Sequence, residues 1–160
     1  SQEAHYLRYC GTAPIQHIYA MRTALDMIAE EGLDAIWTRH TVFANAVRAA
    51  IAAWSTPDGL EFNILDPAQR SNSTTTILSG AVDSARLHQI CEDCAGLTLG
   101  AGLGELAGKS FRIGHMGHLN PPMVLGTLGT VESALLAMQV PIGASGAAAA
   151  AQVIADELTN

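Results

Sequence analysis

Residues 60–78, LEFNILDPAQRSNSTTTIL, decide the fold of this chain. Leu60, Phe62 and Ile64 alternate with polar residues, which is the pattern of a strand that buries one face. Thr74 to Leu78 is rich in β-branched residues and predicts a second strand. The chain between the two strands is too short for the crossover that parallel strands require, so the pattern favours antiparallel pairing.

Helical patterns flank these strands. Apolar residues recur at spacings of three and four after Pro14, and Gly32 is expected to end that helix, because proline suits the first turn and glycine the position past the end. A second helix with one continuous apolar face is expected from about Leu33 to Trp54. The other expected elements are a helix between Asp83 and Gly96, strands at 97–99 and 111–115, a helix from Asn120 to about Met138 and a last helix at 147–158. This mixture predicts the α+β class.

The composition limits the classes of protein to which the chain can belong. Its 160 residues are 49% hydrophobic and 14% charged, with a net charge of −7. A charged fraction below the roughly 25% of soluble domains indicates surface that is buried within the chain or against something else. The acidic balance argues against nucleic-acid binding, and no apolar run reaches the ~20 residues of a membrane span. The absence of a signal-peptide pattern and the three cysteines favour a cytoplasmic location.

Three short motifs are interpreted without a catalytic role. Gly108-Lys109-Ser110 lacks the upstream glycine of a phosphate-binding loop, since position 103 is leucine, so the glycine-rich stretch 100–108 is interpreted as a connection. Cys91-Glu-Asp-Cys94 is a single pair with two carboxylates between the sulfurs, which favours a structural role over redox or metal chemistry. His115 and His118 have no apparent third ligand, so no metal site is predicted.

Two features are compatible with ligand binding. Arg112 lies within the apolar strand 111–113, where an arginine requires a partner, and its planar fork pairs best with a carboxylate or a phosphate. On this pattern a structural ion pair and a ligand-binding role are equal alternatives. Tyr9 and Thr12 place two hydroxyl groups before the first helix, which fits an anion site at a helix N-terminus or, as the simpler interpretation, a helix cap.

The chain resembles a known family over several segments. Residues 9–22, YCGTAPIQHIYAMR, resemble the Tyr-x-x-Thr-x-Pro…Leu-Tyr-x-Leu-Arg segment of class V, fold-type-I aminotransferases. The branch to which they are similar contains the alanine–glyoxylate and serine–glyoxylate aminotransferases. The similarity continues in order through residues 24–33, Trp37-x-x-His40, residues 70–73, residues 108–120 and residues 140–146. It therefore covers essentially the whole chain.

The resemblance implies a pyridoxal-phosphate enzyme of which this chain is the C-terminal part. It implies that Tyr9 and Thr12 reach the cofactor phosphate across a homodimer interface, and that Arg112 binds the carboxylate of the amino-acid or oxo-acid substrate. The Schiff-base lysine of the family lies upstream, in a large domain. Lys109, the only lysine of this chain, matches a residue beside the substrate-binding arginine instead. No residue of the chain is therefore expected to be catalytic.

The implied fold is the C-terminal small domain of a fold-type-I enzyme, with an antiparallel-rich sheet that helices cover. Its expected divisions are a remnant of the cofactor-binding domain at 1–32, a connecting helix at 33–54 and the small domain at 55–160. The implied function is amino transfer from serine or alanine to glyoxylate or pyruvate, with the isolated chain inactive. The alternative is a non-catalytic module for carboxylate binding or dimerisation. Neither nucleic acid nor membrane is an expected partner.

Overall fold

The structure, a computed structural model, describes residues 11–158. The chain divides into two compact units, Ser1–Thr38 and Arg39–Asn160. The first unit contains α1 (Ile15–Glu31), and the boundary between the units falls within α2 (Leu33–Trp54). Both helices have the extents that the apolar periodicity predicts. Within the described residues, no helix combines the length and the apolar character that crossing a membrane requires.

The first unit presents α1 with its apolar side chains exposed. Pro14 is the N-cap of this helix, and Gly32 ends it with a φ of 85°, a conformation that costs glycine little. None of the residues of α1 is buried. Its large exposed apolar side chains are Ile15, Ile18, Tyr19, Met21, Leu25, Met27 and Ile28. Helices in proteins gain most of their stability from packing, so α1 requires a surface that covers this face.

We expect the isolated chain to self-associate through α1, because covering an exposed apolar face is favourable in water. Replacing Ile18 and Leu25 together by glutamate should shift the chain toward monomer in sedimentation velocity. Gln16→Glu adds a negative charge to the same helix at an exposed polar position and should leave the association unchanged. A monomeric unchanged chain with weak binding of a hydrophobic dye would contradict this expectation.

The second unit is built on a four-stranded sheet in the order β1-β2-β4-β3. Each neighbouring pair of strands is antiparallel, which confirms the pairing predicted from residues 60–78. The strands are β1 (Glu61–Phe62), β2 (Thr74–Leu78), β3 (Gly100–Ala101) and β4 (Ser110–Gly114). The helical elements are η2 (Pro67–Gln69), α3 (Ser84–Gln89), η3 (Ile90–Cys94), η4 (Gly104–Leu106), α4 (Pro121–Ala137) and α5 (Gly146–Leu158).

The first strand is shorter than the alternating pattern predicts. β1 ends at Phe62, whereas the alternation extends to Ile64. The chain instead enters a turn in which the carboxylate of Asp66 accepts a hydrogen bond from Ala68 N at 2.9 Å and caps η2. A local side-chain to backbone hydrogen bond of this kind competes with strand pairing.

The segment before β3 also differs from the prediction. The expected strand at 97–99 is an irregular connection, and the strand lies at Gly100–Ala101. Leu97 N donates a hydrogen bond to Cys91 O at 2.8 Å, which ties the start of this segment to the preceding turn. That turn is the π-helical η3, so the single helix expected between Asp83 and Gly96 is α3 followed by a wider turn.

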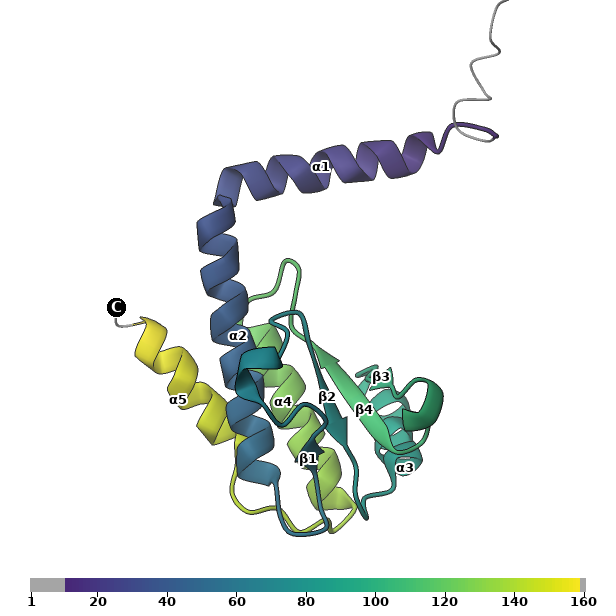
Figure 1. The fold of residues 1–160 in the computed structure, drawn as a ribbon, viewed down its shortest axis with the longest axis vertical. Helices are drawn as coiled ribbons and strands as arrows, with labels where there is room; N and C mark the ends of the chain where they lie inside the picture. Colours follow the sequence, from purple (N-terminus) through teal and green to yellow (C-terminus); the bar gives the residue numbers. More distant parts are fainter. Residues whose placement is uncertain (1–10, 159–160) are drawn as a thin grey trace, which may run out of the picture. The chain divides into compact units, whose positions relative to one another are not determined.

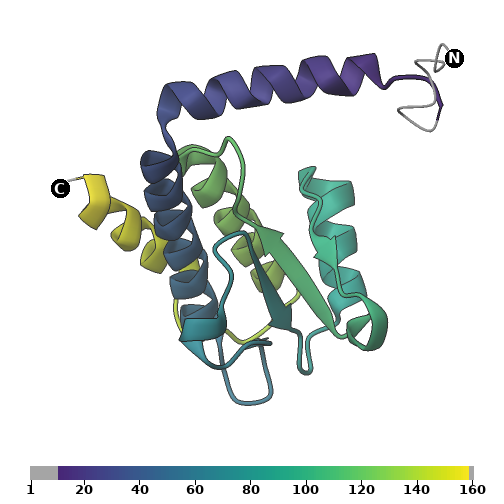
Figure 2. The ribbon, with the colours of Figure 1, turned by 45° about the horizontal axis from the view of Figure 1, so that its top comes forward.

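The hydrophobic core lies on one face of the sheet. It includes Phe43, Val47, Ile51 and Trp54 of α2, Leu128, Val131 and Leu135 of α4, and Ile77 and Phe111 of the sheet. In Figures 1 and 2 the ribbon of α4 lies behind β2 and β4. Successive side chains of a strand point to opposite faces, so Thr76 and Arg112 face away from this core.

Candidate functional site

The backbone of β4 presents Arg112 on the sheet face opposite the core. In the register of the sheet, Arg112 lies opposite Thr76 of β2 on one side and opposite Gly100 of β3 on the other. Its Nε donates a hydrogen bond to Ala101 O at 2.9 Å. A Cβ atom at position 100 would lie 3.0 Å from Arg112 Cβ and 3.4 Å from Nε. Glycine at this position therefore gives the guanidinium side chain room to cross β3.

The guanidinium group of Arg112 is held through one nitrogen, Nε, in the part of the chain that the structure describes. Among the described residues no carboxylate forms an ion pair with it, and its only side-chain hydrogen bond is the one from Nε. The two terminal nitrogens point four N–H donors outward from a fixed anchor. This geometry is that of an arginine prepared for a bidentate anion, and the structural ion pair that the sequence leaves open is not formed within the described residues.

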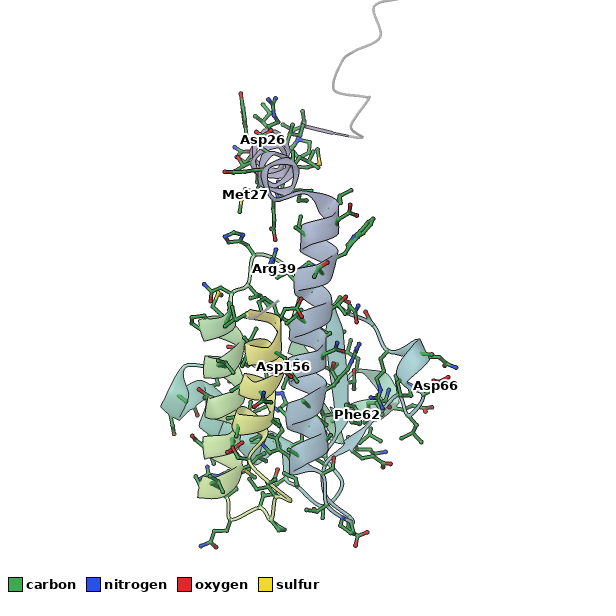
Figure 3. The ribbon with its side chains drawn as sticks, turned by 90° about the vertical axis from the view of Figure 1, so that its left-hand side faces the viewer. Asp26, Met27, Arg39, Phe62, Asp66 and Asp156 are labelled. Carbon is green, nitrogen blue, oxygen red and sulfur yellow. The ribbon has the colours of Figure 1, made fainter. Side chains whose placement is uncertain are left out.

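Two residues of α2 hold the loop that follows β4. His40 Nε2 accepts a hydrogen bond from Gly117 N at 3.0 Å. Arg39, labelled in Figure 3, donates through Nη1 to Gly117 O at 2.8 Å and to Leu119 O at 3.2 Å. These partners are 77 to 80 residues apart in the chain. Local sequence spacing contains no signal for such contacts, and neither residue was predicted to make them.

His115 immediately follows β4 and is fully buried. Its Nδ1 donates to Asn72 O at 3.2 Å, and its Nε2 accepts from Thr75 Oγ1 at 2.9 Å, a tautomer that follows because a carbonyl can only accept. Burial lowers the pKa of His115 to about 4, with the charges of Arg48 and His40 adding to the effect and the bond to Asn72 opposing it. His115 is therefore neutral at physiological pH, and both ring nitrogens are engaged within the protein.

The free energy of unfolding should depend on pH through His115. The folded state binds no proton at this ring between pH 6.5 and about 4, whereas the unfolded state does. The free energy of unfolding therefore decreases as the pH falls through this window and is fully retained above it. Urea titrations at several pH values should show a flatter dependence for His115→Gln. His118→Gln, which removes an exposed histidine of the same loop, should follow the unchanged chain. Equal slopes for all three proteins would contradict the assignment.

Thr12 lies in the first unit, in the exposed segment before α1. The N-cap of α1 is Pro14, and no side chain caps the helix, so the interpretation of Thr12 as a cap is wrong. The Thr12 side chain has no hydrogen bond within the described residues, which leaves its hydroxyl free to bind a ligand. Tyr9, the other hydroxyl of this motif, lies outside the described residues.

The remaining motifs of the sequence contain Lys109, Cys91 and Cys94. Lys109 is exposed in the turn before β4, and it lines a cavity together with Glu61, Asp83 and Glu105. Cys91 is buried, and burial raises the pKa of its thiol, which disfavours the reactive thiolate. Cys94 is exposed, and neither thiol forms a disulfide within the described residues.

Comparison with known proteins identifies the family. The model of the family described as aminotransferase class-V matches residues 1–108. The serine–glyoxylate aminotransferase of Methylorubrum extorquens is 39% identical over 145 residues, which cover 89% of this chain and 35% of that protein. The enzyme of the same name from Arabidopsis thaliana is 37% identical over 141 residues, which cover 88% of this chain and 34% of that protein. The chain thus spans about a third of the length of these relatives.

Solved structures share the fold. The pyridoxamine–pyruvate aminotransferase from Mesorhizobium loti matches with a TM-score of 0.81 and 31% identity over 91% of this chain and 37% of that one. The ureidoglycine–glyoxylate aminotransferase from Bacillus subtilis matches with a TM-score of 0.75 and 29% identity. The match covers 85% of this chain and 35% of that one. These matches confirm the α+β fold that the resemblance implies. On sequence and fold together, this chain belongs to the class V aminotransferase family.

Proposed function

We propose that this chain is the C-terminal part of a pyridoxal-phosphate-dependent aminotransferase that moves an amino group from a small amino acid, serine or alanine, to glyoxylate or pyruvate. Membership of the family supports amino transfer. The names of the serine–glyoxylate and pyridoxamine–pyruvate relatives support the small amino acid and the small oxo acid. The chain spans about a third of these relatives, so the proposed activity belongs to the complete protein, and the isolated chain is expected to be inactive.

The observation that carries the proposal is the open guanidinium edge of Arg112. Amino donors and oxo-acid acceptors share one group, a carboxylate next to the reacting carbon. Arg112 Nε is fixed on Ala101 O at 2.9 Å, so the Nη1–Nη2 edge has a defined direction before a ligand arrives. Two parallel N–H donors match the two oxygens of a carboxylate. Arg112 would therefore bind and orient both substrates through the same contact.

The residues of the first unit fit a phosphate group of the cofactor. The hydroxyl of Thr12 is exposed and has no partner among the described residues, and a hydroxyl is a suitable donor to a phosphate oxygen. Thr12 and Tyr9 would hold the phosphate of pyridoxal phosphate bound mainly by the other subunit of a homodimer. The cofactor, when bound, supplies an electron sink for the carbon next to the substrate carboxylate.

The proposal extends to the organisation of the complete protein. Residues 1–32 would belong to the cofactor-binding domain, residues 33–54 would form the connecting helix, and residues 55–160 would form the small domain. The exposed apolar face of α1 supports this division, because a helix without a buried residue requires a neighbouring surface. The three cysteines form no even disulfide framework, which supports a cytoplasmic protein.

Transfer of a nitrogen label tests the proposed function. The complete protein, loaded with pyridoxal phosphate, would be incubated with glyoxylate and ¹⁵N-labelled serine or alanine. We expect the label in glycine, the product of amino transfer to glyoxylate, and no transfer by the isolated chain of 160 residues. Failure of both donors to label glycine, and of pyruvate to accept the label, would refute the proposal.

A further inference from the structure

A cavity of about 220 Å³ lies at the edge of β2, where β1 ends early. We call it the Arg70 notch and define it by Asn63, Arg70, Ser71, Thr74 and Thr76, which line it. No aspartate or glutamate is among its lining residues. Arg70 is the charged residue of this lining. The cavity that contains Lys109, by contrast, is lined by Glu61, Asp83 and Glu105.

The guanidinium group of Arg70 is held along one edge and on one face. Its Nε donates to Ile64 O at 2.9 Å, and its Nη2 donates to Leu65 O at 3.0 Å. Its central carbon lies 3.9 Å from the centroid of the Phe62 ring, which places the cation over an aromatic face. Figure 3 shows Phe62 and the Asp66 turn on the same side of α2. The side chain is therefore held in one orientation before a ligand binds.

These contacts leave one edge of the Arg70 guanidinium open. A guanidinium carries five N–H donors, and the two carbonyls use the Nε–Nη2 edge. The other edge, formed by Nη1 and the second hydrogen of Nη2, has no partner among the described residues. That edge presents two parallel donors, the arrangement that accepts a carboxylate or a phosphate bidentately.

Among residues 11–158 no acidic group forms an ion pair with Arg70. Asp66 lies four residues away, but Oδ1 accepts from Ala68 N at 2.9 Å and Oδ2 accepts from Gln69 Nε2 at 3.2 Å. A second cation, Arg48, donates to Ser71 O at 2.8 Å, and its pKa is lowered by burial and then by the charge of Arg70. Two arginines thus lie near each other without a counter-ion from the described residues.

Neutral donors complete the notch. The Thr76 hydroxyl and the Asn63 side-chain amide have no hydrogen bond within the described residues, although both line the cavity. Thr74 already donates to Ile113 O at 3.3 Å, and Ser71 Oγ is shared with Ser73 Oγ at 2.7 Å. Thr76 and Asn63 are therefore the neutral groups that remain available to a ligand beside the Arg70 edge.

We propose that the Arg70 notch is a binding site for a small oxyanion, a carboxylate or a phosphate, with the Nη1–Nη2 edge of Arg70 as its principal donor pair. Arg112 is not among the residues that line the notch, and the site does not depend on the proposed amino transfer. Arg70 follows η2, whereas Arg112 belongs to β4 and bonds Ala101 of β3. Thr76, which lines the notch, is the neighbour of Arg112 in the sheet.

Side-chain and backbone NMR of the ¹⁵N-labelled chain tests this site. Sodium acetate and sodium phosphate would be titrated separately at constant ionic strength. We expect saturable shifts of the Arg70 Nε–Hε, the Asn63 side-chain amide and the Thr76 amide, with dissociation constants in the range of about 1–10 mM, because such small ligands make few contacts. Saturation with acetate alone assigns a carboxylate, and saturation with phosphate alone assigns a phosphate. Shifts that remain linear for both anions would refute the site.

Matched variants separate the notch from general charge effects. Arg70→Gln should weaken binding by about tenfold to a hundredfold, since hydrogen bonds to a charged partner are lost. Arg86→Gln removes the same charge from an exposed arginine that bonds Gln89, and should leave binding unchanged. Thr76→Val keeps the branched shape of the side chain but removes its hydroxyl, and it should weaken binding about fivefold. This variant tests the site even if Arg70→Gln does not fold. Loss of the shifts in Arg112→Gln, with retention in Thr76→Val and Arg70→Gln, would overturn the proposal and leave the function of Arg112 intact.

Discussion

Substitution of Arg112 by alanine in the complete protein is expected to weaken binding of the amino-acid and oxo-acid substrates by about 30- to 700-fold. This range corresponds to about 2–4 kcal/mol, the usual loss when one partner of a hydrogen-bonded charge pair is truncated. The physical reason is the fixed guanidinium edge, which no residue of the described chain neutralises. Substrate dissociation constants, measured by spectral titration of the cofactor-loaded protein, give the effect directly.

Two further variants define the cause of that loss. Arg112→Lys keeps the positive charge but loses the fork and the Nε bond to Ala101, so it should recover only part of the affinity. Arg86→Ala, at an exposed arginine, should bind substrates normally. The absorbance of the bound cofactor should be unchanged in all three variants. Unaltered substrate affinity in Arg112→Ala would show that the carboxylate binds elsewhere.

Substitution of Glu132 by alanine is expected to lower the free energy of unfolding by about 3–4 kcal/mol. This carboxylate joins α2, α4 and α5. It accepts from Trp54 Nε1 at 2.8 Å, from Ser145 Oγ at 2.7 Å and from Ala147 N at 2.9 Å. Trp54 is fully buried, so its indole N–H would be left without a partner, and α5 would lose the acceptor at its first turn.

Chemical denaturation measures this loss, and pH supplies a second test. Burial alone would raise the pKa of Glu132, but the hydrogen bonds from Trp54, Ala147 and Ser145 outweigh it and lower the pKa below 4.5. The stabilisation is therefore complete above pH 4.5 and disappears as the pH falls through the lowered value. Glu105→Ala, at an exposed carboxylate of η4, should change neither property. An unfolding free energy of Glu132→Ala that matches the control would contradict the role of this carboxylate.

The parts of the fold that follow from local pattern were predictable. The sequence predicts α1 and α2 through their apolar periodicity, because one face of each helix must be buried or covered. It also predicts the start of α4, where Asn120 caps the helix before Pro121. The antiparallel pairing of β1 with β2 follows from the short chain between them. The position of β3 was not predictable, because Gly100 and Ala101 have no strand preference and pair only through the register of β4.

The candidate site could be predicted from the sequence only where a single residue indicates its chemistry. Arg112 stands out because an arginine within an apolar strand requires a partner. The open edge of Arg70 was not apparent, since it depends on two carbonyls and an aromatic ring that only the folded turn brings together. The contacts of Arg39 and His40 with Gly117, and those of Glu132, join residues far apart in the chain and have no local pattern. Tertiary contacts of this kind need the folded chain.

The most direct test of the central claim is a crystal structure of the complete protein, loaded with pyridoxal phosphate, in complex with a substrate carboxylate. The account predicts that both carboxylate oxygens accept hydrogen bonds from Nη1 and Nη2 of Arg112, while Nε keeps its bond to Ala101 O. A carboxylate held by other residues, with Arg112 paired to an acidic side chain of the protein, would contradict it.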